Sequence, residues 1–141
     1  MYEPIRSKSV HSTMAGPDDF PHRSREEELD IQLAGHLAAL LAVTDELRAA
    51  EPSADLHTAA ERLTQEITRL RGGRTPARAS AAASGRETDT AALHRRAHAL
   101  AGRALVVAAS RADTAAAILA AERMDAHTAA QQPRPLASSA H

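Results

Sequence analysis

The chain has 141 residues, of which 43% are hydrophobic, 1% are aromatic and none is cysteine, and its formal net charge is −1. This length suffices for one ordinary domain. The lack of cysteine excludes disulfides, thiolate nucleophiles and cysteine-ligated metals, and two aromatic residues (Tyr2 and Phe20) are too few for an aromatic-lined ligand pocket or a base-stacking platform. No run of eighteen apolar residues predicts a transmembrane helix, and residues 1–6 lack the apolar core of a signal peptide, so we expect a cytoplasmic protein.

Charge and residue type are unevenly distributed. Residues 1–68 carry 6 basic and 13 acidic side chains, a net charge of −7, whereas residues 69–141 carry 11 basic and 5 acidic side chains, a net charge of +6. Alanine makes up roughly a quarter of the chain and buries little surface, so the core depends on leucine, isoleucine, valine and methionine. The alanine and arginine enrichment is also what a GC-rich genome produces.

Residues 1–23 contain three prolines and no periodicity, which predicts a disordered arm. Ser24 and Glu27 have the spacing of a capping box, and leucines then recur at alternating steps of four and three up to Pro52. Ser53 can cap a second amphipathic helix that ends at Gly72-Gly73. The short connection between these helices predicts a helical hairpin over residues 24–72.

Residues 73–88 are rich in Gly, Ser, Pro, Ala and Arg, which is typical of a flexible linker. A third helical pattern covers residues 89–130 without a proline. We expect one long helix here, continuous or kinked; the alternative is a break at Ser110–Asp113, where the spacing again matches a capping box. Residues 131–141 contain Pro133 and Pro135 and predict a disordered tail. The expected fold is therefore all-α: a helical hairpin and one long alanine-rich helix in a three-helix bundle with disordered termini.

His94 and His98 are four residues apart, which places two imidazoles on one face of a helix, and His36 is the best third candidate for a metal site. Arg95 and Arg96 lie between the two histidines and disfavour a bound cation. We therefore interpret the histidines as ordinary helix residues and expect no metal and no cofactor.

Arginines in and around the linker offer a second candidate site. Flexible basic segments can neutralise phosphates without reading sequence, and the candidate contacts are Arg71, Arg74 and Arg78. The chain lacks a recognisable nucleic-acid-binding motif and any aromatic interleaving. We therefore favour solvated arginines, or arginines that pair with the acidic half of the chain, over a nucleic-acid contact.

The alanine-rich stripe of the last helix is the third candidate site. Small residues let helix backbones approach closely, and the far end of an overhanging helix would need a covering partner. The alternative is that the stripe packs inside the monomer. The residues in question are Leu105, Ala108, Ala112, Ala115, Ile118, Leu119 and Met124.

Catalytic motifs are missing from the sequence: it has no Gly-rich phosphate loop, no G-x-S-x-G and no cysteine nucleophile. No motif identifies a family. The leading hypothesis is a non-enzymatic helical protein that binds another protein or itself, as an oligomer, away from membranes. The alternative is a regulatory protein that contacts nucleic acid through its arginine-rich middle segment.

Overall fold

The computed structural model describes residues 23–78 and 88–132. Within these ranges the chain forms four α-helices and no strand, which confirms the all-α prediction: α2 (Arg25–Ala50), α3 (Ala54–Leu70), α4 (Thr90–Arg111) and α5 (Thr114–Gln131). Nearly all of the predicted arm (1–23) and tail (131–141), and most of the predicted linker, lie outside the described residues.

Helix α2 begins and ends where its local sequence directs. The Ser24 hydroxyl accepts from the backbone N–H of Glu27 at 3.0 Å, and the Glu27 carboxylate accepts from the backbone N–H of Ser24 at 2.9 Å, which completes the predicted capping box. The helix ends at Ala50, and Glu51 still donates its N–H to Leu47 at 2.7 Å. Pro52 follows, and because it lacks an N–H it cannot extend the helix.

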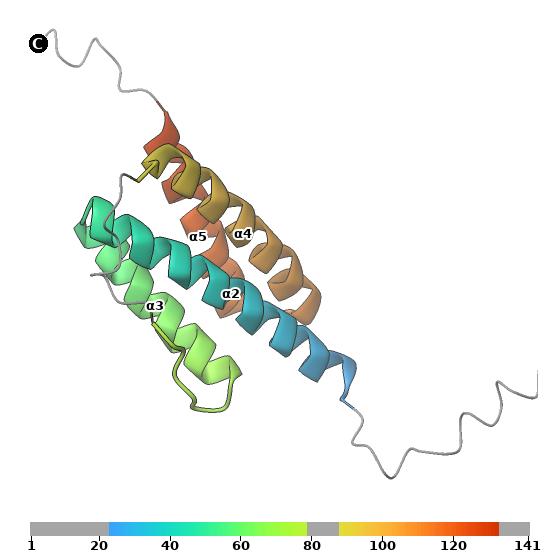
Figure 1. Cartoon of the computed structure of the whole chain (residues 1–141). Helices are drawn as coiled ribbons and strands as arrows, with labels where there is room; N and C mark the ends of the chain where they lie inside the picture. Colours follow the sequence, from blue (N-terminus) through green and yellow to red (C-terminus); the bar gives the residue numbers. More distant parts are fainter. Residues whose placement is uncertain (1–22, 79–87, 133–141) are drawn as a thin grey trace, which may run out of the picture.

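Helix α3 starts directly after this turn. The Ser53 hydroxyl accepts from the backbone N–H of Leu56 at 3.1 Å. The helix ends before Gly72 and Gly73, which both have positive φ angles, 68° and 100°, and the N–H of Gly73 donates to the carbonyl of Thr68 at 2.8 Å. The two helices lie antiparallel as a hairpin (Figure 1).

The prediction of one long helix over residues 89–130, and with it the three-helix bundle, is wrong. Ala112 adopts the left-handed conformation (φ 59°, ψ 37°), and the N–H of Asp113 donates to the carbonyl of Ala108 at 2.9 Å, which is the hydrogen bond of a Schellman turn. The Asp113 carboxylate then accepts from the N–H of Ala116 at 3.1 Å and caps α5. The chain therefore reverses at the alternative break, and α5 packs against α4.

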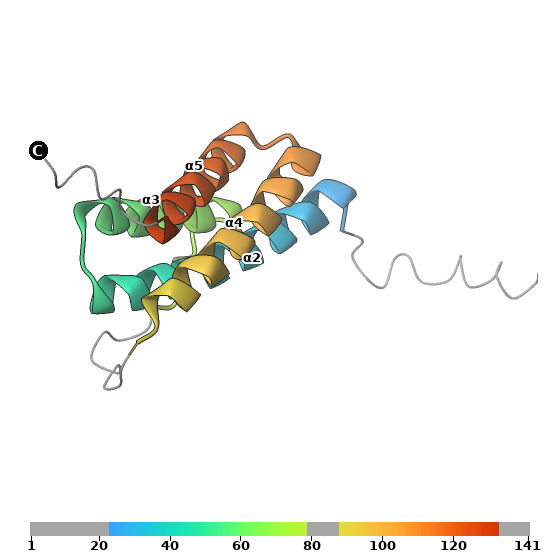
Figure 2. The ribbon, with the colours of Figure 1, turned by 90° about the horizontal axis from the view of Figure 1, so that it is seen from above.

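The helices form two layers. Figure 2 shows α2 and α4 side by side on one side of the molecule and α3 and α5 on the other. Helix α4 runs antiparallel to α2, and its end is tied to the start of α2 by the Arg111–Asp30 ion pair at 3.0 Å. Helix α5 runs antiparallel to α3, and Arg69 near the end of α3 pairs with Asp113 at 2.9 Å. The direct contact between α3 and α5 is much smaller than the other three helix contacts.

The core combines large residues from the hairpin with small residues from α4. Helices α2 and α3 bury leucines, together with Val43 and Ile67, whereas four of the five residues that α4 buries are alanines: Ala97, Ala101, Ala104 and Ala108. Because helix separation depends on the side chains at the contact, small residues bring α4 close to its neighbours. Met124 of α5 illustrates this, since it reaches to 3.7 Å from where a Cβ on Gly102 would stand.

The left-handed Ala112 gives a direct test of the chain reversal. We expect Ala112→Gly to raise the free energy of unfolding by about 0.5–1 kcal/mol, because glycine adopts a positive φ angle without the steric cost that a Cβ carries. The same substitution at Ala42, an exposed position inside α2, should lower it by about 1 kcal/mol. Urea denaturation followed by circular dichroism measures both changes. A loss of stability in both variants would contradict the left-handed turn.

Candidate functional site

Helix α5 carries two polar residues on the face that it buries. Its buried positions begin with Ala116, Leu119 and Ala120, and continue with Arg123 and His127. Arg123 is 4% exposed and His127 is 1% exposed. Buried arginines and histidines require partners, because a buried polar group without a hydrogen bond destabilises the fold.

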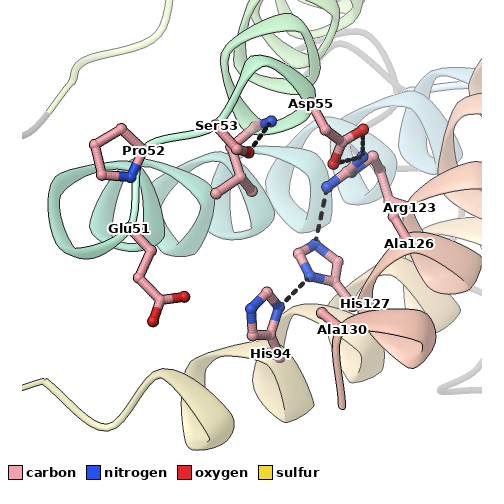
Figure 3. A pocket seen from close by; sticks show the side chains of 10 residues that line it. Glu51, Pro52, Ser53, Asp55, His94, Arg123, Ala126, His127 and Ala130 are labelled. Carbon is pink, nitrogen blue, oxygen red and sulfur yellow. Dashed lines mark hydrogen bonds and ion pairs between the residues drawn. The ribbon is translucent and has the colours of Figure 1, made fainter. Parts of the chain in front are cut away.

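The partners of Arg123 and His127 come from two other helices (Figure 3). Arg123 donates from Nη1 to both carboxylate oxygens of Asp55, at the start of α3, at 3.2 and 3.1 Å. Its Nη2 lies 3.3 Å from Nε2 of His127, and Nδ1 of His127 lies 2.9 Å from Nδ1 of His94 on α4. We call this hydrogen-bonded series, Asp55–Arg123–His127–His94, the polar chain.

The polar chain dictates where its protons lie. Arginine stays protonated and can only donate, so Nε2 of His127 accepts and its Nδ1 carries the hydrogen. His94 then accepts at its own Nδ1 and carries its hydrogen on Nε2. Both imidazoles are therefore neutral, and each ring nitrogen between them has a fixed role as donor or acceptor.

The surroundings disfavour a positive charge on either imidazole. Burial is the main cause that lowers the pKa of His127 from its ordinary value of 6.5 to about 4, and the positive charge of Arg123 lowers it further. Burial also lowers the pKa of His94, with the Glu51 carboxylate acting in the opposite direction. At neutral pH the polar chain thus contains one ion pair and two uncharged rings.

A cavity of about 300 Å³ borders the polar chain. Figure 3 shows Glu51 and His94 on one side of this cavity and Arg123 and His127 on another. Its full lining is Glu51, Pro52, Ser53, Asp55, Leu56, His94, Arg123, Ala126, His127 and Ala130. The Arg123 charge is already matched by Asp55, and Arg123 Nε is buried without a hydrogen-bond partner. These groups can hold water or a small polar molecule, but they offer no surplus positive charge to an anion.

The histidines considered as metal ligands do not meet. His94 contacts His127 instead of His98, which lies one turn further along α4, and His36 lies on α2. Within residues 23–78 and 88–132, no group of three or more histidine, aspartate or glutamate side chains has the geometry to hold a metal ion.

The residues of the predicted interaction stripe separate into buried and exposed sets. Ala108 and Leu119 are buried in the monomer core, and Leu105 and Met124 pack against it. An overhanging helix would have left Leu119 exposed, but the reversal at Ala112 turns this face of α5 towards α4. Exposed residues of the stripe are Ala112, Ala115 and Ile118. Ile118, which is 51% exposed, borders a shallow, mostly apolar depression of about 280 Å³ at the α4–α5 turn.

One of the three candidate phosphate contacts is already engaged. Arg78 donates from Nε and Nη2 to the two carboxylate oxygens of Asp45, both at 2.7 Å. Although burial raises the pKa of Asp45, hydrogen bonds from Arg78 and Arg48 outweigh it, so this pKa lies below its ordinary value of 3.8. Arg74 donates to the backbone carbonyl of Arg71 at 3.3 Å. The segment is thus held to the helices through Arg78.

The outer face of α4, like Arg71 and Arg74, carries positive charge that forms no ion pair with a described residue. This helix contains no acidic residue between Thr90 and Arg111. Its exposed positions follow each other at steps of three and four, which makes one continuous line along the helix: Arg96, Ala99, Arg103, Val106 and Ser110, with Arg95 beside them. None of these three arginines forms an ion pair with any residue that the structure describes. We call this set of six residues the α4 outer face.

Sequence reasoning did not single out Asp55, Arg123 or His127. The signal was nevertheless present, because Leu119, Arg123 and His127 follow one another at steps of four. Once a break at Asp113 is assumed, that spacing continues the buried apolar face of the last helix into two polar residues. The prediction of one helix over residues 89–130 gave no reason to place Arg123 and His127 on a buried face. The partner Asp55 could not be read from the sequence either, because it lies 68 residues away from Arg123.

Replacing Arg123 tests the electrostatics of the polar chain. We expect Arg123→Met to raise the pKa of His127 above about 4 without restoring 6.5, because the positive charge is lost while the burial remains. The matched control is Arg62→Met, which removes the exposed Arg62–Glu122 ion pair between the same two helices. NMR titration of the imidazole resonances measures both variants. An equal shift in both, or none in Arg123→Met, would contradict the assignment.

Comparison of the chain with protein-family profiles, with curated proteins and with solved structures found no match in any of the three. Among the described helices, none is both long enough and apolar enough to cross a membrane.

Proposed function

We propose that this protein is a non-catalytic helical interaction protein that self-associates through the α4 outer face. The observation that carries the proposal is the unpaired positive charge of Arg95, Arg96 and Arg103 on a helix without acidic residues. Other arginines of the described chain, such as Arg69 and Arg111, pair with carboxylates of neighbouring helices.

The α4 outer face combines charge with apolar surface, as the rim and centre of protein interfaces do. Val106 is 66% exposed and lies three residues after Arg103, so both point to the same side of the helix. Ala99 adds a small side chain on the same line, which permits close approach of a second helix. A partner that fits this face has acidic side chains around a small apolar contact.

A second copy of the chain supplies such a partner. The first turn of α2 carries three exposed acidic residues, Glu26, Glu27 and Glu28, of which Glu28 already pairs with Arg23 at 3.3 Å. This turn lies near the C-terminal end of α4, because Asp30 pairs with Arg111. If two copies pack with their α4 helices antiparallel, the acidic turn of each copy approaches the arginine-bearing half of the other. The formal net charge of −1 leaves little long-range repulsion between copies.

Nucleic acid is the alternative partner for an arginine-bearing surface. The Arg78–Asp45 ion pair removes one of the three phosphate contacts considered for the linker. The three arginines on α4 can neutralise only a few phosphates of a nucleic acid. The exposed apolar Val106, which lies between these arginines and the end of the helix, is better covered by a protein than by a phosphate backbone. A protein partner is therefore the better supported of the two.

The test is the molar mass in solution by light scattering, as a function of protein and salt concentration. We expect a dimer whose dissociation constant rises about tenfold or more between about 0.05 M and about 0.5 M salt, because screening weakens exposed charge pairs. In the double variant Arg96→Glu, Arg103→Glu, we expect the dissociation constant of the dimer to rise by at least the same factor. The reason is that attraction between unlike charges becomes repulsion between like charges.

The matched control is Arg71→Glu, Arg74→Glu, which changes the net charge by the same amount at the end of α3. This control should keep the dimer. A monomer at all concentrations overturns the proposal, and so does a dimer that survives in the α4 variant. If the wild type is monomeric and binds RNA or DNA in a manner that the α4 variant abolishes, the alternative function replaces it.

A further inference from the structure

The two halves of α5 are held in different ways. Its first half buries Ala116, Leu119 and Ala120 among apolar side chains. Its second half buries only Arg123 and His127, and the other contact with the core is the partly buried Met124. The attachment of the last two turns of α5 thus depends mainly on hydrogen bonds of the polar chain, and a segment with few buried apolar contacts opens at low free-energy cost.

We propose that the polar chain is an acid-sensitive latch, which holds the second half of α5 against α3 and α4 and releases it when an imidazole of the chain takes up a proton. Each imidazole nitrogen that contacts another member of the polar chain acts either as a hydrogen-bond donor or as an acceptor. Nε2 of His127 accepts from Arg123, and Nδ1 of His94 accepts from His127. A proton from solvent converts one of these two acceptors into a donor, and two donors then face each other.

Neither proton position can be relieved by a change of tautomer. A proton on Nε2 of His127 faces the Arg123 guanidinium, which cannot lose its own proton. A proton on Nδ1 of His94 faces the Nδ1–H of His127, which could become an acceptor only by moving its hydrogen to Nε2, against Arg123. Either position breaks one contact of the latch.

The charged groups around the two rings disfavour a proton on His127 and draw a protonated His94 away from it. Arg123 on α5 and His94 and His98 on α4 all disfavour a charge on His127, and Asp55 on α3, which opposes them, is already bound to Arg123. Glu51, after the end of α2, favours a charge on His94. Since Glu51 lies across the cavity from His127, the protonated His94 ring is drawn away from His127.

The direction of the pH effect follows from linkage. The pKa of His127 is about 4 in the closed state and 6.5 when the ring is free, so the open state binds the proton more tightly. The latch is at full strength above pH 6.5 and weakens as the pH falls towards 4. By this pKa difference alone, the ratio of open to closed molecules at pH 5 is about 30-fold higher than its value at high pH. Below pH 4 the increase approaches about 300-fold.

The first experiment is amide hydrogen exchange followed by mass spectrometry at about pH 7 and about pH 5, with exchange rates corrected for intrinsic pH dependence. We expect residues 123–131 to open about 20-fold more at the lower pH, while residues 114–120 change much less. Equal changes in the two halves, or none in residues 123–131, overturn the proposal.

His127→Gln is the decisive variant. The glutamine amide offers an oxygen to Arg123 and an N–H to His94, but it does not titrate between pH 7 and 4. We expect it to reduce the acid-induced opening of residues 123–131 severalfold, whereas the control His36→Gln, on α2, keeps the wild-type response. An acid response of wild-type size in His127→Gln overturns the latch.

A measurement on the wild-type protein guards against misfolding of the variant. Long-range ¹H–¹⁵N NMR of the imidazoles at neutral pH should show hydrogen on Nδ1 of His127 and on Nε2 of His94. Hydrogen on Nε2 of His127, or a His127 pKa at or above 6.5, overturns the proposal. The latch does not depend on self-association, because its readouts are local and can be measured with a monomer.

Discussion

The chain reversal at Ala112 and Asp113 is the constraint on which the rest of the structure depends. It converts what would be one long overhanging helix into two antiparallel helices, so that Leu119 is covered by the same chain. It also sets the rotation of α5, which brings Arg123 to Asp55 and His127 to His94. Without the reversal neither the polar chain nor the cavity beside it would form.

Size complementarity explains why an alanine-rich chain has a stable core. Helix α2 provides more of the large buried side chains than any other helix, and the alanines of α4 let the helices approach so that the α2 leucines are enclosed. Met124 over Gly102 repeats the arrangement between α4 and α5. Because α3 and α5 share little direct contact, ion pairs carry much of their connection, from Arg69–Asp113 at one end to Arg123–Asp55 at the other.

Some of the charged side chains on the surface form ion pairs within the molecule, and others do not. The acidic first half and the basic second half of the sequence meet inside one molecule at pairs such as Arg78–Asp45 and Arg111–Asp30. Arg95, Arg96 and Arg103 have no such partner among the described residues and face outward. The association that we propose through α4 depends on exposed charge, whereas the latch that we propose on α5 depends on buried histidines.

The sequence by itself determined the local structure. The capping box at Ser24, the stop at Pro52, the cap at Ser53 and the glycine turn at Gly72 act through residues a few positions apart, so they can be read from the chain. Tertiary structure decided between a continuous helix and a break near Asp113, because alanine permits both and only packing of α5 on α4 favours the left-handed Ala112. The polar chain, whose members lie 33 and 68 residues apart, exists only after that choice.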